Sequence, residues 1–177
     1  MWSSKVSISA LTAIVVVALS ACGFKPMYGK GGDDVYRAEF PRISIAQIED
    51  REGQMLRNEL LTLMHPRGQA PKQDYRLSIT LQESESGIAV SKSSFSTRAN
   101  YTIVASIHMN SLIDDKPVFT DSVSLTGSYN VLQSQYATLM AEKDVKERLI
   151  RELAKSIVNR VSLRFMALSK NPDMATP

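Results

Sequence analysis

The chain has 177 residues, of which 44% are hydrophobic and 22% charged, with a formal net charge of +3 and one cysteine. This length and composition fit one globular domain and exclude a wholly disordered or fibrous protein. A single cysteine excludes an internal disulfide framework and a cysteine-based zinc site, and the mild positive charge does not indicate a nucleic-acid binder.

The N-terminus reads as a secretory signal. Lys5 precedes an apolar run over residues 6–19, which is shorter than the roughly 20 residues that span a membrane. The run ends in Leu-Ser-Ala-Cys at 19–22, which resembles the bacterial lipobox. We therefore predict a lipoprotein signal peptide over 1–21, cut before Cys22, with diacylglycerol and an N-acyl chain on that cysteine. The alternatives are a buried, inert Cys22 or an uncleaved anchor helix.

The next segment is predicted to be a tether. Residues 23–34 contain Pro26 and four glycines, a composition typical of an irregular linker, so residues 22–39 are expected to lead away from the lipid. Gly23, and not Asp, follows the cysteine. In lipoproteins of enterobacterial type, an Asp at this position favours retention in the inner membrane. The Gly23 of this chain therefore resembles an outer-membrane sorting signal.

A strand and a helix are expected next. Residues 40–48 carry Ile43, Ile45 and Ile48 after Pro41, which predicts a strand with the proline at its beginning. Over residues 51–64 the apolar spacing becomes helical and places Leu56, Leu60, Leu63 and Met64 on one face. Pro66 cannot continue this helix.

Three strands with alternating patterns follow. The apolar positions are Tyr75, Leu77, Ile79 and Leu81 in the first, Tyr101, Ile103, Ala105, Ile107 and Met109 in the second, and Val123, Leu125 and Tyr129 in the third, over 118–129. Such alternation predicts half-buried strands. Short connections, including a turn at Asp114-Asp115-Lys116-Pro117, favour antiparallel pairing.

A long helix is predicted from Asn130 to about Ser169. Its apolar stripe contains Val145, Leu149, Leu153, Ile157, Val161, Phe165 and Leu168. Residues 170–177 have no periodicity and are expected to be a disordered tail. The order β-α-β-β-β-α predicts one α+β domain over 40–169. We expect a two-layer sandwich with about four mostly antiparallel strands and two helices on one face.

No catalytic constellation is found. The nucleophile-elbow, zincin and phosphate-loop motifs are absent, and no ligand spacing suits a metal or cofactor. Asp114 and Asp115 fit a turn better than acid–base chemistry. His108 lies on the polar face of a strand, and His65 follows a helix end. The sequence therefore indicates a protein that is not an enzyme.

Two segments have the character of a binding site. Residues 84–98 join two strands and combine Lys92 and Arg98 with apolar residues, a mixture suited to an anionic amphiphile. The plainer alternative is an extended hairpin with a solvated tip. Near the start of the last helix, Lys143 and Lys146 oppose the helix dipole and suggest an anion, although residues 127–137 also read as a capping region.

Three features together resemble the lipopolysaccharide-assembly lipoprotein family (LptE) in its alphaproteobacterial form. They are Cys-Gly-Phe-Lys-Pro-Met-Tyr-Gly at 22–29, the order of elements, and Tyr129-Asn130 with Ser134, Tyr136 and Ala137 before the last helix. The resemblance covers nearly all of residues 22–169. It implies a two-layer fold, as the residue patterns also do.

The resemblance also implies a function. Such lipoproteins sit in the outer membrane on its periplasmic side, plug a large β-barrel partner, help that barrel assemble and deliver lipopolysaccharide to the outer leaflet. They are also implied to contact lipopolysaccharide through basic residues at one end of the sheet, for which Lys92, Arg98 and Lys143 are the candidates. The alternative is an auxiliary lipoprotein of an ABC-type envelope lipid-trafficking system.

Overall fold

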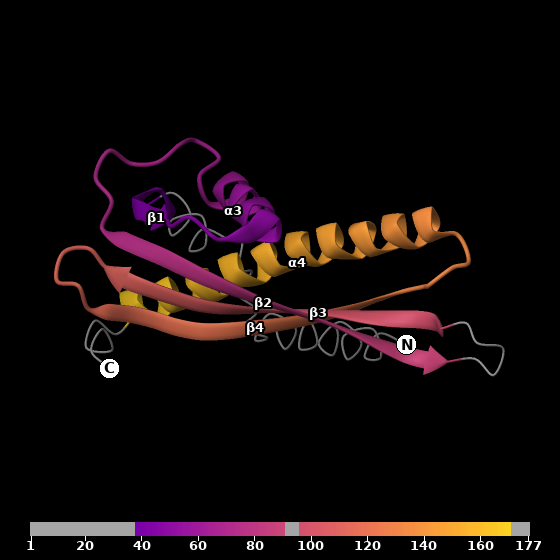
Figure 1. Ribbon diagram of the computed structural model, residues 1–177. Coiled ribbons are helices and arrows are strands. Elements are labelled where there is room, and N and C mark those ends of the chain that lie inside the picture. The colour runs from indigo at the N-terminus through magenta and orange to yellow at the C-terminus, as the bar shows by residue number, and fades with distance from the viewer. Residues whose placement is uncertain (1–37, 91–95, 171–177) are drawn as a thin grey trace, which may run out of the picture.

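The structure, a computed structural model, describes residues 38–90 and 96–170. Its elements are the 3-10 turn η1 (Phe40–Arg42), β1 (Ile43–Ile45), α3 (Asp50–Met64), β2 (Tyr75–Val90), β3 (Ser96–Ser111), β4 (Pro117–Tyr129) and α4 (Gln135–Lys170). In Figure 1 the long strands run side by side and α4 follows them along most of their length. The predicted order β-α-β-β-β-α is confirmed.

The four strands form one mixed sheet in the order β1-β2-β3-β4. The β2–β3 and β3–β4 pairs are antiparallel, with Ile79 opposite Ile107 and Ile103 opposite Leu125. β1 pairs with β2 in parallel, because the chain passes through α3 before it returns to the sheet. β1 covers only the first residues of β2, up to Leu77.

Both helices lie on one side of the sheet (Figure 1). α4 packs on β3 and β4, whereas α3 packs on α4 and β1. The odd-numbered residues of the strands face the helices, and the core between the layers includes Leu77, Ile103, Ile107 and Met109. The apolar stripe of α4 is buried from Val145 to Phe165 as its spacing predicts. The α+β two-layer prediction is therefore confirmed.

The first strand is shorter than its predicted range of 40–48. Residues 40–42 form the turn η1, so Pro41 lies in that turn and not at the beginning of a strand. Proline fits the first positions of a helical turn because its fixed φ suits them and its missing N–H needs no partner there. The strand ends at Ile45, and the buried Ile48 belongs to the connection to α3.

Gly53 allows this connection to pack closely on the first turn of α3. A Cβ atom on Gly53 would lie 2.6 Å from Cγ2 of Ile48 and 3.0 Å from its backbone carbon. At the other end of α3, His65 Nε2 donates a hydrogen bond to the Phe40 carbonyl oxygen over 2.9 Å. Because both contacts join α3 to the chain around β1, the helix and this short strand form one unit.

The start of α4 is capped by hydroxyl side chains. Ser134 Oγ accepts a hydrogen bond from the Ala137 N–H over 3.4 Å, and Thr138 Oγ1 accepts one from the Leu132 N–H over 2.9 Å. Such caps satisfy backbone donors that have no partner within the helix. The capping alternative for residues 127–137 is thus supported. No helix within residues 38–90 and 96–170 is both long and apolar enough to cross a membrane.

Candidate functional site

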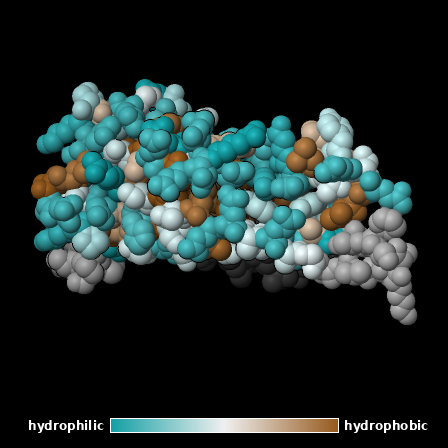
Figure 2. Space-filling model, viewed as in Figure 1, coloured by the Kyte–Doolittle hydropathy of each residue, from teal (hydrophilic) through white to brown (hydrophobic). Residues whose placement is uncertain are grey.

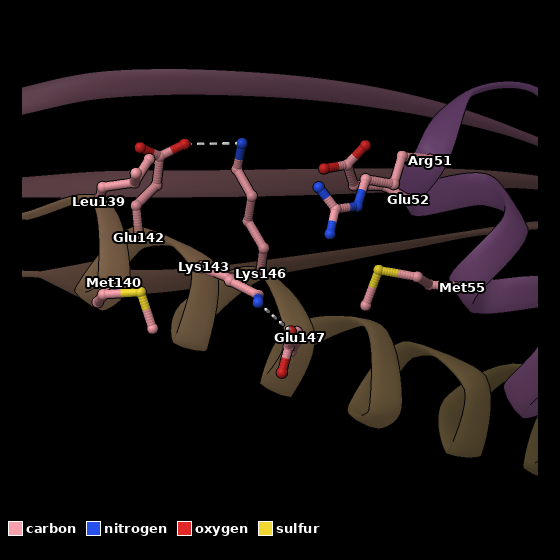
Figure 3. Close-up of a pocket in the computed structure, with 9 residues that line it drawn as sticks. All are labelled: Arg51, Glu52, Met55, Leu139, Met140, Glu142, Lys143, Lys146 and Glu147. Carbon is pink, nitrogen blue, oxygen red and sulfur yellow. Dashed lines mark ion pairs between the residues drawn. The ribbon is translucent and has the colours of Figure 1, made fainter. Parts of the chain in front are cut away.

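A surface groove lies between the two helices, near the start of each. Its volume is about 330 Å³. We call it the helix groove (Figure 3), and it is lined by Arg51, Glu52 and Met55 of α3 and by Leu139, Met140, Glu142, Lys143, Lys146 and Glu147 of α4. Its position follows from the fold, because α3 joins α4 partway along its length and leaves the first turns of α4 uncovered.

The charges of the helix groove are balanced. Three cationic side chains face three carboxylates. Lys146 Nζ lies 2.8 Å from Glu142 Oε1, and Lys143 Nζ lies 3.9 Å from Glu147 Oε1 (Figure 3). The hydrogen bond from Lys146 to Glu142 raises the pKa of Lys146 above its ordinary value. A bare anion would therefore have to displace a carboxylate to pair with either lysine.

Aromatic and acidic side chains of the sheet lie beneath this groove. Tyr101 of β3 is buried, and Lys146 Nζ sits 5.0 Å from the centre of its ring, in the range of a cation–π contact. Burial raises the pKa of Tyr101, and the Glu83 carboxylate adds to this shift. Tyr101 thus gives Lys146 a second partner besides Glu142.

A second tyrosine–carboxylate pair lies farther along the sheet. The Tyr129 hydroxyl of β4 donates a hydrogen bond to Glu85 of β2 across the intervening strand. Burial, followed by this bond, raises the pKa of Tyr129. Leu77 and Ile79 of β2 are buried on the side of the strand that faces the helices. Glu83 and Glu85 are odd-numbered like them, so alternation places them on the same side. Their carboxylates make this end of the sandwich polar where the helices cover it least.

Exposed apolar side chains gather beside the helix groove at the start of α4. Leu132, Tyr136, Leu139 and Met140 are between 43% and 72% exposed. Figure 2 shows hydrophobic residues in small groups among hydrophilic ones, including at the end of the molecule where α4 begins. Leu139 and Met140 also line the groove, so its rim joins an apolar surface to paired charges.

The structure does not bring the predicted site residues together. Cys22 and Lys92 lie outside the described residues. Arg98 is exposed near the start of β3. The Asn100 side chain accepts a hydrogen bond from Ser128 on the face of the sheet that α3 and α4 do not cover. Arg98 is two residues from Asn100 along β3, so alternation places Arg98 on the same face. Lys143 lies on the helix side, paired with Glu147. Arg98 and Lys143 thus belong to opposite faces.

The interpretation of Lys143 and Lys146 as cations in the first helical turns is wrong. α4 begins at Gln135, so both lysines lie beyond the first turn, where the influence of the helix dipole has decayed. Their partners are glutamates one turn away. The ordinary stabilisation of helical ion pairs accounts for these lysines without a bound anion.

The other polar residues singled out from the sequence have local roles. His108 lies 3.5 Å from the Thr120 hydroxyl on the open side of the sheet. Asp114 is in the β3–β4 turn and pairs with Lys116 over 3.7 Å. In the part of the chain that the structure describes, no group of three histidine, cysteine or acidic residues is placed to hold a metal ion.

Sequence reasoning missed the helix groove. Arg51, Glu52 and Met55 have no local signature that distinguishes them from other residues of an amphipathic helix. They become lining residues only because α3 docks at a particular height along α4. The apolar residues before and within the start of α4 were a weak signal, since Leu132, Leu139 and Met140 fall off the buried stripe.

Comparisons with known proteins agree with the fold. A family model described as lipopolysaccharide assembly (LptE) matches residues 40–161. This range runs from η1 well into α4 and includes the whole sheet and the helix groove. No curated protein matches the sequence.

Several solved structures share this architecture. A Caulobacter crescentus protein described as a candidate lipoprotein superimposes with a TM-score of 0.59 at 18% identity, covering 76% of this chain and 96% of its own. Rare lipoprotein B from Shewanella oneidensis superimposes with a TM-score of 0.57 at 8% identity, covering 72% of this chain and 96% of its own. A minor lipoprotein from Acinetobacter baumannii superimposes with a TM-score of 0.57 at 11% identity, covering 70% of this chain and 92% of its own. At these identities the likeness shows the fold.

Proposed function

The chain belongs to the LptE family of lipopolysaccharide-assembly lipoproteins, and we propose that it anchors in the outer membrane through Cys22 and plugs the β-barrel that inserts lipopolysaccharide into the outer leaflet. The match over residues 40–161 carries the proposal, because it takes in the complete sheet and most of α4. A role in lipopolysaccharide assembly and the absence of catalysis follow from the family itself.

The proposed anchor is the lipid on Cys22, with residues 23–37 as the link to the folded domain. Two or three acyl chains on one residue give stable membrane attachment, whereas one chain gives only marginal binding. The described chain begins beside η1, at the opposite end of the molecule from the start of α4 (Figure 1). The helix groove would then lie at the end away from the attachment of the tether.

Direct contact with lipopolysaccharide is the second part of the proposal. Lys92, Arg98 and Lys143 remain its candidate residues. Of the two that the structure describes, Arg98 is exposed and forms no ion pair within the described chain, whereas Lys143 is paired with Glu147. The anionic groups of lipopolysaccharide would therefore meet less competition at Arg98 than at Lys143.

Affinity purification of the tagged, full-length lipoprotein from detergent-solubilised membranes tests the function. We expect a large outer-membrane β-barrel in near-equal amount, identified by mass spectrometry. The same lipoprotein should resist protease when it is co-expressed with the barrel and be digested faster without it. Recovery of an ABC-system component instead would favour the auxiliary-lipoprotein alternative, and equal digestion in both samples would count against the plug.

A further inference from the structure

Within residues 38–90 and 96–170, no helix packs on one of the two faces of the sheet. This face is formed by the even-numbered residues over 78–86 of β2, 100–108 of β3 and 120–128 of β4, which we call the open face. The odd-numbered residues of the same strands point to α4, as the burial pattern of β3 shows. Both helices, α3 and α4, lie on that other side (Figure 1), so neither of them covers the open face.

The open face has an unusual composition. None of its residues is Asp, Glu, Lys or Arg, and almost all are serine, threonine, asparagine or glutamine. A surface built to face water usually has charges at about a quarter of its positions or more. Here the nearest charged residues on this side, Arg76 and Arg98, stand beyond its two ends. The helices, by contrast, carry many charged side chains, including those of the helix groove.

This composition lowers the free energy needed to remove water from the open face. Burial of an unpaired charge costs far more than burial of a hydroxyl group that finds a new partner. A hydroxyl both donates and accepts, so it can bond to almost any polar group opposite it. Some of these side chains are already held in place, since the Thr102 and Thr126 hydroxyls lie 2.9 Å apart and Ser128 Oγ donates to Asn100 Oδ1 over 2.6 Å.

The same composition argues against other occupants. The open face has no Phe, Tyr or Trp on which a sugar ring could stack, and its one aliphatic residue, Val104, is too little to hold acyl chains. Without cations, it has nothing to attract phosphate groups. A fitting partner is a wide, polar surface that can exchange hydrogen bonds with hydroxyls. The inner wall of a transmembrane β-barrel is such a surface, because lumen-facing residues are polar.

We propose that the open face packs against the polar inner wall of the barrel partner, and that the helix side of the domain faces the remaining lumen. This inference rests on the proposed function, since it names the surface by which the plug meets its barrel. It assigns the three long strands to the protein interface and leaves the helix groove accessible.

Site-specific photo-crosslinking tests this assignment in cells that contain the full-length lipoprotein and the barrel. A benzophenone residue is placed at Thr80, Ser106 or Ser124 of the open face. The matched controls carry it at the exposed helix residues Glu152 or Lys155. We expect at least a tenfold higher yield of barrel crosslinks from the open face than from the helix controls. A higher yield from the helix controls would overturn the inference, and so would crosslinks from the open face to residues 23–37 of the same chain.

A charge-insertion experiment gives an independent readout. Ser106→Lys and Ser124→Lys should each lower the amount of co-purified barrel at least tenfold while the thermal midpoint stays within about 2 °C, as is usual for substitutions outside the core. Lys155→Glu is the control and should leave both values unchanged. Full barrel recovery with both lysine variants would refute the interface but not the function. Failure of the unsubstituted lipoprotein to recover any barrel would instead refute the function.

Discussion

Gly127 of β4 lies directly against Val145 of α4, so closely that a Cβ atom on Gly127 would stand 2.8 Å from Val145 Cγ1 and 3.1 Å from Leu149 Cδ1. This contact sets the distance between the two layers at the end where the helix groove opens. Val145 cannot easily move aside, because a β-branched side chain in a helix has essentially one rotamer.

Gly127→Ala should therefore destabilise the domain although alanine restricts the unfolded chain more than glycine. Overpacking costs about 1–3 kcal/mol, and the entropic gain offsets about 0.4–1 kcal/mol of it. We expect a net loss of roughly 1 kcal/mol in the free energy of unfolding by urea titration. Ser124→Ala, on the exposed face of the same strand, is the control. A Gly127→Ala protein as stable as this control would show that the layers adjust freely.

Ile157 tests whether the stripe of α4 supplies the core. Its side chain is fully buried, and Ile157→Ala should cost about 3 kcal/mol through lost transfer free energy and the cavity left behind. Leu163 in the same helix is 56% exposed, so Leu163→Ala should change stability by less than about 0.5 kcal/mol. Thermal and chemical unfolding would measure both. Similar losses in the two variants would contradict the orientation of α4.

The bond from Tyr129 to Glu85 predicts a change at high pH. The pKa of Tyr129 is raised in the folded state, so the folded protein favours the neutral phenol. The associated stability is present below the unfolded pKa of about 10 and is lost as the pH rises above that value. Tyr129→Phe should lose about 1 kcal/mol at pH 8 and show a flatter decline above pH 10. Tyr136→Phe, at an exposed position, should keep the profile of the original protein.

Cys22→Ala tests the lipid anchor. Without the thiol no thioether to diacylglycerol can form, and the lipoprotein peptidase should leave the signal peptide in place. We expect a higher polypeptide mass, because the signal peptide stays attached, and no lipid adduct in intact mass spectrometry. Lipid adducts that persist in this variant would sink the lipobox interpretation.

Neutralising Lys92 and Arg98 together should weaken binding to purified lipopolysaccharide by about fivefold for each cation, the amount expected of an exposed ionic contact. Lys143→Gln should have a smaller effect, because Glu147 already offsets that charge. Light scattering or a pull-down with immobilised lipopolysaccharide would compare the variants with Lys155→Gln. A large fall in thermal midpoint would instead make the pair structural.

The sequence patterns predicted the elements but not every pairing. A pattern within a single element was sufficient to predict that element, as with the alternation over Tyr75–Leu81 and Tyr101–Met109 and the apolar stripe from Val145 to Phe165. The parallel pairing of β1 and the placement of Pro41 in η1 depend on how α3 returns the chain to the sheet. No local pattern encodes that path.

The same limit applies to the site. Arg51 and Lys146 approach one groove from helices far apart in the sequence, and the partners of Lys146 come from β3 and its own helix. Charge pairing between neighbours at i and i+4 could have been read from the sequence of α4. The stacking of Lys146 on Tyr101 could not, because it depends on the angle between α4 and the sheet.

α4 runs without interruption for 36 residues, about 54 Å at the usual rise of a helix, and it is fastened to both the sheet and α3. A helix that is held along its length in this way keeps its two ends, at Gln135 and Lys170, at a fixed distance from each other. If the barrel binds the open face and a lipid on Cys22 holds the beginning of the chain, as we propose, the two attachments raise each other's effective concentration, and loosening one weakens the other.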